Sequence, residues 1–223
     1  MTKRLNEQLD KFSAKNKKIR FSFGTLVVMC LSVIAMIVAT FTLLKMPNSQ
    51  GIVLFFNSPT IFIKQKMYMT YGIDYIPQIP ILLFICTILG RKFSLMSIIA
   101  YILIGIFLFP VFSFGGGIKY FLQYNFGYIL AYIPAVLMAT FFLKKDRKFI
   151  TCLLAVLSSV LIIHFFGSIY LTLVAMVKQD SFDFAWALIS HQTAGKILYD
   201  IILGYLAVTI ARPTKHILWL AMG

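Results

Sequence analysis

Charged residues divide this chain into long apolar stretches. The windows without a charge cover residues 21–44, 75–90, 93–118, 120–143 and 149–177. Because a helix needs about 20 apolar residues to cross the hydrocarbon core of a bilayer, these windows predict five spanning helices. A sixth stretch, 184–211, is apolar except for Lys196 and Asp200, and its length fits a tilted spanning helix. The pattern predicts an all-α integral membrane protein, a six-helix bundle forming one domain over residues 1–223.

Composition agrees with this pattern. The chain is 60% hydrophobic and carries 21 basic against 7 acidic residues. A net charge of +14 raises the hypothesis of nucleic-acid binding, but the basic residues are divided among short loops beside apolar stretches. Membrane topology and anionic lipid headgroups explain that distribution better, so we expect contact with membrane lipid and no nucleic-acid partner.

The basic residues also predict the orientation, because cytoplasmic loops hold an excess of Lys and Arg. One side of the predicted bundle holds the basic segment 1–20 together with Arg91, Lys92, Lys144, Lys145, Arg147, Lys148, Arg212 and Lys215. The opposite side holds fewer, namely Lys45, Lys64, Lys66, Lys119 and Lys178. Both termini are therefore expected in the cytoplasm, with the protein in the cell (inner) membrane.

One extracytoplasmic connection, 45–76, is unusually long for a loop between two spans. It holds apolar runs too short to span a bilayer, so it is interpreted either as a lid or interfacial segment or as an outer loop folded on the helix ends. In the first span, Ala35 and Ala39 form a small-xxx-small pattern that permits close helix contact. That contact can be with a partner protein or within the chain.

The apolar pattern is broken between residues 109 and 117, where Pro110 is followed by the run Gly115, Gly116 and Gly117. Proline and glycine both interrupt helices. Backbone groups freed near membrane depth are tolerated only where protein or a water-filled cavity satisfies them. The break therefore predicts a ligand pocket at the outer side of the bundle.

Lys196 and Asp200 lie inside the sixth predicted span, where a charge costs about 2.5–3.5 kcal/mol on insertion scales. They are four residues apart and share a helix face, so one interpretation is a mutual ion pair that makes the helix insertable. The functional interpretation gives Lys196 the carboxylate of a ligand. Asp200 then accepts hydrogen bonds or holds the lysine in place.

Enzymatic patterns are weak. His164, His191 and His216 fall at different depths of the predicted bundle, and the three cysteines lie in separate spans, so neither a metal site nor a disulfide framework is expected. The sequence contains no HExxH, GxSxG or Walker A motif. We expect no enzyme and no cofactor, and any energy from ATP must come from another chain.

Specific sequence blocks lie between Ile76 and Pro134. They include Leu108-Phe109-Pro110-Val111-Phe112, the three glycines 115–117, and Phe126-Gly127-Tyr128-Ile129-Leu130-Ala131-Tyr132. In this order the blocks resemble BioY, the biotin-binding membrane subunit of energy-coupling factor (ECF) transporters.

That resemblance implies six helices with cytoplasmic termini and a biotin pocket near the extracytoplasmic side. It also implies that Ala35 and Ala39 match an AxxxA motif through which the first helix contacts the coupling subunit, which works with two cytoplasmic ATPases. The family's last helix typically opens with Pro-Gly-Asp-x-x-Lys. Here the chain has Gly195, Lys196 and, four residues later, Asp200.

Biotin combines a ureido ring, an apolar sulfur ring and a carboxylate, so its pocket should be mostly apolar with a few placed polar groups. Asn125 both donates and accepts hydrogen bonds, Tyr128 offers a ring face and a hydroxyl, and Lys196 suits the carboxylate. The predicted substrate-binding set is Gly115, Gly116, Gly117, Asn125, Gly127, Tyr128, Lys196 and Asp200. Ordinary alternatives remain open: Asn125 as a helix cap, Tyr128 in the interfacial aromatic belt, and the glycines as a turn.

Three other functions stay open from the sequence. The chain can be an S component for another vitamin, a membrane enzyme that acts on a lipid, or a scaffold that only packs against partners. An enzyme would need clustered His, Asp or Glu side chains at the bilayer surface.

Overall fold

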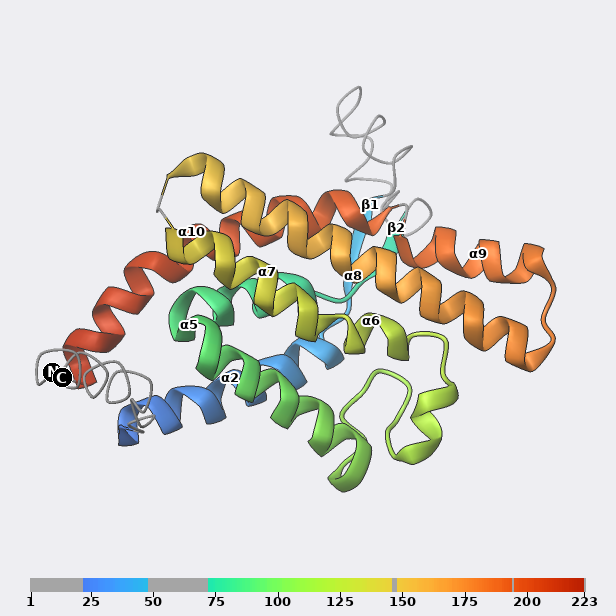
Figure 1. The fold of residues 1–223 in the computed structure, drawn as a ribbon, viewed down its shortest axis with the longest axis horizontal. Coiled ribbons are helices and arrows are strands. Elements are labelled where there is room, and N and C mark those ends of the chain that lie inside the picture. The colour runs from blue at the N-terminus through green and yellow to red at the C-terminus, as the bar shows by residue number, and fades with distance from the viewer. Residues whose placement is uncertain (1–21, 48–71, 146–147, 194, 223) are drawn as a thin grey trace, which may run out of the picture.

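The computed structural model describes residues 22–47, 72–145, 148–193 and 195–222. The basic segment 1–20 and most of the long connection 45–76 lie outside these residues. The elements in chain order are α2 (Phe23–Phe41), β1 (Leu44–Pro47), β2 (Gly72–Tyr75), α5 (Gln78–Leu103), a π-helical segment (Ile104–Leu108), a 3₁₀ segment (Ile118–Leu122), α6 (Phe126–Leu130), α7 (Tyr132–Lys145), α8 (Phe149–Lys178), α9 (Phe182–Thr193) and α10 (Lys196–Met222) (Figure 1).

Within the described residues, five helices are long and apolar enough to cross a membrane. They are Phe23–Phe41, Gln78–Leu108, Phe126–Lys144, Phe149–Lys178 and Phe182–Leu218. The predicted number of six is not confirmed, because the windows 75–90 and 93–118 fall within one of these helices. That helix is interrupted at Gly90, whose φ of 69° and ψ of −177° are not helical and favour glycine. The chain changes direction there (Figure 1).

The bundle is organised around α5, which packs against α2, α7 and α10, while α8 packs against α6, α7 and α10. Lipid is as apolar as leucine, so helices in a bilayer associate through close packing of their surfaces. At Gly204 of α10, an added Cβ would lie 2.7 Å from the Leu83 side chain and 3.2 Å from Val156. Glycine therefore lets α10 lie close to both α5 and α8.

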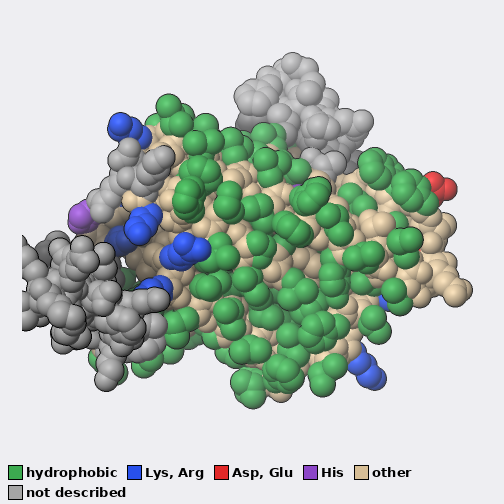
Figure 2. Space-filling view, viewed as in Figure 1, with side chains coloured by type: hydrophobic (Ala, Val, Ile, Leu, Met, Phe, Trp, Pro, Cys, Tyr) green, Lys and Arg blue, Asp and Glu red, His purple; other side chains and the backbone are tan. Residues whose placement is uncertain are grey.

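The outer surface has the character of a membrane protein. Large apolar side chains cover most of the visible face, and Lys and Arg side chains gather at the end where α10 ends (Figure 2). The exposed residues Arg91 and Lys92 follow the bend in α5, and exposed Lys144 and Lys148 flank the α7–α8 junction. An apolar surface of this extent marks contact with a bilayer, so the protein is a multi-pass membrane protein.

The described ends of the connection 45–76 form a small antiparallel sheet. Strands β1 and β2 pair with Lys45 opposite Asp74, and the two side chains form an ion pair. The Lys45 ammonium holds the pKa of Asp74 below its ordinary value. Tyr199 of α10 donates a hydrogen bond to the Pro47 carbonyl at 2.6 Å. The sheet is thereby attached to the beginning of α10.

The glycine-rich break folds back onto the end of α5. Gly117 N–H donates to the Gly105 carbonyl at 2.9 Å. An added Cβ at Gly116 would lie 2.6 Å from that same carbonyl oxygen and 2.7 Å from the Cα of Pro110. Phe112 is 1% exposed and its ring packs against Gly105. The glycines thus permit a close backbone approach that places Phe112 in the core.

Candidate binding site

A cavity lies where β2 and the start of α5 meet α6, α7, α8 and the α9–α10 junction. It holds about 640 Å³ of empty space, a figure that includes open solvent. The apolar lining includes Ile79, Ile129 and Ile163. The polar lining includes Tyr75, Gln78, Asn125, His164, Lys196 and Asp200.

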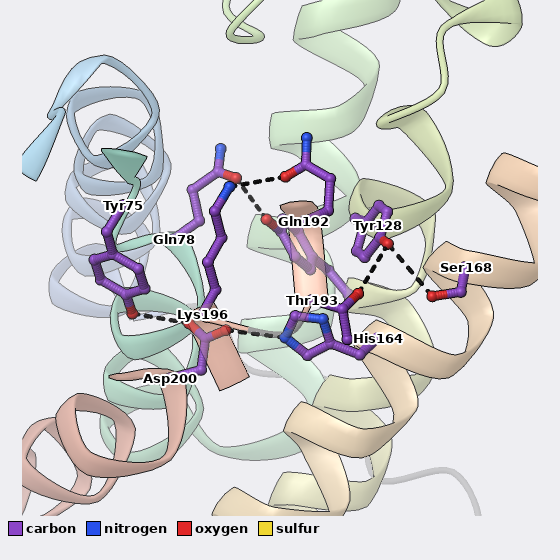
Figure 3. Close-up of polar contacts among 10 residues, drawn as sticks. Tyr75, Gln78, Tyr128, His164, Ser168, Gln192, Thr193, Lys196 and Asp200 are labelled. Carbon is purple, nitrogen blue, oxygen red and sulfur yellow. Dashed lines mark hydrogen bonds and ion pairs between the residues drawn. The ribbon is translucent and has the colours of Figure 1, made fainter. Parts of the chain in front are cut away.

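Asp200 lies at the floor of the cavity and is only 3% exposed. Tyr75 donates its hydroxyl to Oδ1 at 2.8 Å, and His164 Nε2 lies 3.0 Å from Oδ2 (Figure 3). A buried carboxylate is costly unless hydrogen bonds satisfy its oxygens. The Asp200 carboxylate therefore connects α10 to β2 and α8 at the floor of the cavity.

Tyr75 ends strand β2 and is 1% exposed. Burial and the neighbouring Asp200 carboxylate raise its pKa well above the ordinary value. Its hydroxyl is therefore protonated at neutral pH and remains a donor to Asp200. The pairing of β2 with β1 and the turn into α5 bring Tyr75 to this position, although it lies 125 residues before Asp200.

Lys196 stands one helical turn before Asp200 but is not bonded to it. Its ammonium donates to Gln192 Oε1 at 2.9 Å, and Gln192 Nε2 donates to Asn125 Oδ1 at 2.9 Å. Among the residues that the structure describes, no ion pair joins Lys196 and Asp200. The mutual ion pair considered from the sequence is thus not formed, and the lysine charge faces an uncharged amide in the cavity.

The side-chain amide of Gln78 also lines the cavity, and hydrogen bonds engage both its oxygen and its nitrogen. Its Oε1 accepts from the Tyr132 hydroxyl at 2.6 Å, and its Nε2 donates to Thr40 Oγ1 at 2.6 Å. The Tyr101 hydroxyl completes the group, at 2.9 Å from Thr40 Oγ1 and 3.2 Å from Gln78 Nε2. This network connects α2, α5 and α7. It fixes one side of the cavity by hydrogen bonds that are already satisfied.

Tyr128 of α6 forms part of the wall next to His164. Its ring lies against the backbone of Gly167, where an added Cβ would come within 2.4 Å of the ring. The ring centroids of Tyr128 and His164 are 5.9 Å apart in an edge-to-face arrangement. The hydroxyl makes long contacts of 3.3 Å with Thr193 and 3.4 Å with Ser168. Glycine in α8 therefore positions Tyr128 tightly while its hydroxyl stays weakly bonded.

The cavity brings together half of the predicted binding set, namely Asn125, Tyr128, Lys196 and Asp200. Gly116 and Gly117 line a separate hollow at the end of α5, and Gly127 packs against Tyr170 of α8. Gly115 lies between Phe114 and Gly116 and exchanges two backbone hydrogen bonds with Phe112. A ligand contact by these four glycines stays a prediction.

The two alanines of the predicted partner contact lie on α2. Ala39 is 4% exposed, and Ala35 is half-buried within the chain. The exposed side chains of α2 are large and apolar, including Leu31, Ile34 and Val38. The structure thus leaves part of Ala35 open to a partner and covers Ala39.

Sequence reasoning missed several lining residues, above all Tyr75, Gln78, His164 and Gln192. His164 was considered only as a metal ligand, and the described residues contain no cluster of three metal-binding side chains. Nothing in the spacing of these four residues indicates that they meet. One pattern was available: His164 places an imidazole in a span whose other polar side chains are mostly hydroxyls, and ionisable residues inside a membrane face the interior of a bundle.

The arrangement suits capture of a small ligand. Its lining combines the half-buried cation of Lys196, several hydrogen-bonding side chains and apolar side chains. These features define a class: a helical membrane protein with several spans and a polar cavity for a small molecule.

Comparison with known proteins narrows that class. Residues 62–219 match the model of the BioY family, which is more than half of the chain, and the chain belongs to this family. The chain is also similar to the crystal structure of the S-component for biotin from an ECF-type ABC transporter. The identity is 23%, the TM-score is 0.60, and the match covers 86% of this chain and 90% of that chain. At this identity the likeness shows a shared fold. A search of curated proteins finds no match.

Family membership confirms the resemblance seen in the sequence. It makes the chain a substrate-binding subunit of a membrane transporter and not an enzyme.

Proposed function

We propose that the chain captures biotin at the extracytoplasmic side of the cell (inner) membrane and delivers it to an ECF-type transporter. Three observations support this proposal: membership of the BioY family, a fold shared with the S-component for biotin, and a cavity lined by both polar and apolar side chains. ATP is used only by partner subunits, and biotin is the transported ligand and not a cofactor.

The observation that carries the proposal is the state of Lys196. It is half-buried in the cavity and hydrogen-bonds an uncharged amide, while Asp200 is engaged elsewhere. A cation held in this way is suited to a carboxylate, and a charge-assisted hydrogen bond is stronger than a neutral one. Lys196 binds the valerate carboxylate of biotin near the opening of the cavity.

The remaining groups fit the other parts of the ligand. Ile79, Ile129 and Ile163 provide apolar surface for the sulfur ring and the flexible chain. Asn125 and Tyr128 offer hydrogen-bonding groups along the wall. Asp200 acts from the floor by holding Tyr75 and His164 in place and by accepting hydrogen bonds. A ligand contact by the glycines 115–117 and Gly127 stays a prediction from the sequence, because these residues do not line the cavity.

Topology and partners belong to the same proposal. Counting the two halves of α5 on either side of Gly90 separately gives six segments, with both termini in the cytoplasm. The end of the molecule where Lys and Arg gather supports this orientation (Figure 2). The coupling subunit docks against α2 beside the predicted pair Ala35 and Ala39, of which Ala35 is the more accessible, and connects the chain to two cytoplasmic ATPases.

Equilibrium binding of radiolabelled biotin to the purified protein in nanodiscs tests the proposal. We expect saturable binding that unlabelled biotin competes away and that an excess of thiamine, riboflavin or folate does not. Binding of another vitamin in place of biotin would make the chain an S component of different specificity. Turnover of an added lipid substrate would instead support a membrane enzyme.

A further inference from the structure

His164 has one nitrogen that is used and one that is not. Nε2 lies 3.0 Å from Asp200 Oδ2. Nδ1 is buried and has no hydrogen-bond partner among the described residues, and the whole residue is 6% exposed. Buried polar atoms in folded proteins nearly always have a partner, so each exception asks for an explanation. His164, which carries this unpaired nitrogen, also lines the cavity.

The contacts of Asp200 determine which proton His164 carries. Asp200 Oδ1 already accepts from the Tyr75 hydroxyl, and an ionised carboxylate only accepts hydrogen bonds. The contact between His164 Nε2 and Oδ2 therefore requires a hydrogen on Nε2. In the neutral imidazole the hydrogen is then absent from Nδ1, which becomes an acceptor. In this tautomer the floor thus holds a buried acceptor that has no donor among the described residues.

The neighbouring side chains do not supply that donor. Tyr128 meets His164 with its ring, while the Tyr128 hydroxyl contacts Thr193 and Ser168 (Figure 3). Lys196 is directed to Gln192. Burial increases from Lys196, which is half-buried, to His164 and Asp200, which are buried. A ligand held by its carboxylate at Lys196 therefore extends its other end toward the floor.

We propose that His164 binds the ureido head of the ligand by accepting a hydrogen bond from one ureido N–H at Nδ1, with Asp200 and Tyr75 fixing the ring that accepts it. This inference rests on the proposed function and specifies which end of biotin faces the floor. It makes His164 a residue that determines specificity, because a ligand without an N–H at this point leaves Nδ1 buried without a partner.

Two substitutions separate a ligand contact from a structural role. The amide of glutamine in His164→Gln reaches the position of Nε2, so it retains a donor for Asp200 and loses the acceptor at Nδ1. Asparagine in His164→Asn reaches the position of Nδ1, so it retains an acceptor there and loses the contact with Asp200. If His164 binds the ligand, His164→Gln lowers biotin affinity by about tenfold or more and His164→Asn by less.

A ligand series completes the test. In two cyclic carbamate analogues of biotin, oxygen replaces one or the other ureido N–H without adding bulk. We expect the wild-type protein to bind at least one of them about tenfold or more weakly than biotin, and we expect His164→Gln to show little further loss for that analogue. The analogue comparison uses wild-type protein, so it remains decisive if a variant does not fold.

The inference is overturned if both analogues bind the wild-type protein as tightly as biotin. It is equally overturned if a folded His164→Gln variant binds biotin normally, or if His164→Asn loses at least as much affinity as His164→Gln. Failure of the proposed function is a different result, since the wild-type protein would then not bind biotin at all. Size-exclusion profiles and thermal unfolding establish that each variant is folded.

Discussion

Two regions of this protein differ in how their polar groups are used. In the glycine-rich break, backbone groups satisfy one another: Gly117 bonds to Gly105, and Phe112 and Gly115 exchange two hydrogen bonds. In the cavity, side chains from β2, α8 and α10 converge, and Lys196 and His164 retain unused capacity. The glycines of the break thus serve a close approach of backbone segments. The cavity is the better candidate for a ligand site, because its buried polar side chains are not fully paired.

The largest expected effect comes from removing the carboxylate of the floor. Asp200→Ala leaves the Tyr75 hydroxyl and His164 Nε2–H buried without their acceptor. We expect a loss of about 3 kcal/mol in the free energy of unfolding, since each orphaned buried group costs roughly 1–3 kcal/mol. Thermal unfolding in detergent measures it. Asp183→Ala, at an exposed position of α9, is the control, and an equal loss in both variants would contradict the role of Asp200.

Lys196→Ala should act on binding more than on folding. Loss of a hydrogen bond to a charged group costs about 2 kcal/mol, which corresponds to roughly a thirtyfold weaker affinity for biotin. Isothermal titration measures this change, with Lys119→Ala at an exposed site as the control. Biotin methyl ester lacks the negative charge, so wild type and Lys196→Ala should bind it alike. A thirtyfold difference for the ester as well would place the carboxylate elsewhere.

Gly116→Ala tests the role of the glycine-rich break. The added methyl group meets the Gly105 carbonyl at 2.6 Å, so the loop must shift, at a cost of about 1–2 kcal/mol in stability. We expect unchanged biotin affinity in the folded fraction, because Gly116 does not line the cavity. A clear loss of affinity in folded Gly116→Ala would instead support a ligand contact by the glycines, as the sequence predicts.

The smallest effect concerns the ion pair between Lys45 and Asp74 on the sheet. Because the folded-state pKa of Asp74 is lowered from 3.8, the ion pair stabilises the folded protein above that pH. This stabilisation is lost as pH falls through the lowered folded-state pKa. The pair is exposed to solvent, so salt should weaken it. Acid unfolding of wild type and Asp74→Asn should differ slightly above pH 3.8 and converge in stronger acid. If the stabilities of the two proteins still differ in stronger acid, the difference comes from a contact other than this ion pair.

The sequence predicts the membrane architecture well because the bilayer imposes a simple physical requirement. Apolar windows of spanning length correspond to α2, α5, α7, α8 and the region of α10. The exact number of spans is harder, since a single residue, Gly90, decides whether two windows form one straight helix or turn back. A left-handed glycine cannot be distinguished in a sequence from one that simply packs.

The site was predicted less completely. Lys196 and Asp200 are conspicuous because charges are expensive inside a membrane. Their four-residue spacing also allows a mutual ion pair, which the structure does not form. Their actual partners, Gln192, Tyr75 and His164, reach them through the turn between α9 and α10, the β1–β2 pairing and the packing of α8 on α10. Such convergence is a tertiary property that single-sequence patterns do not encode.

We propose that biotin binds in the cavity between β2, α8 and α10. A crystal or electron cryomicroscopy structure of the protein with biotin tests this proposal most directly. We expect ligand density in this cavity, with the carboxylate within hydrogen-bonding distance of Lys196 Nζ and a ureido N–H facing His164 Nδ1. Biotin bound outside the cavity, against the glycines 115–117 alone, would contradict it.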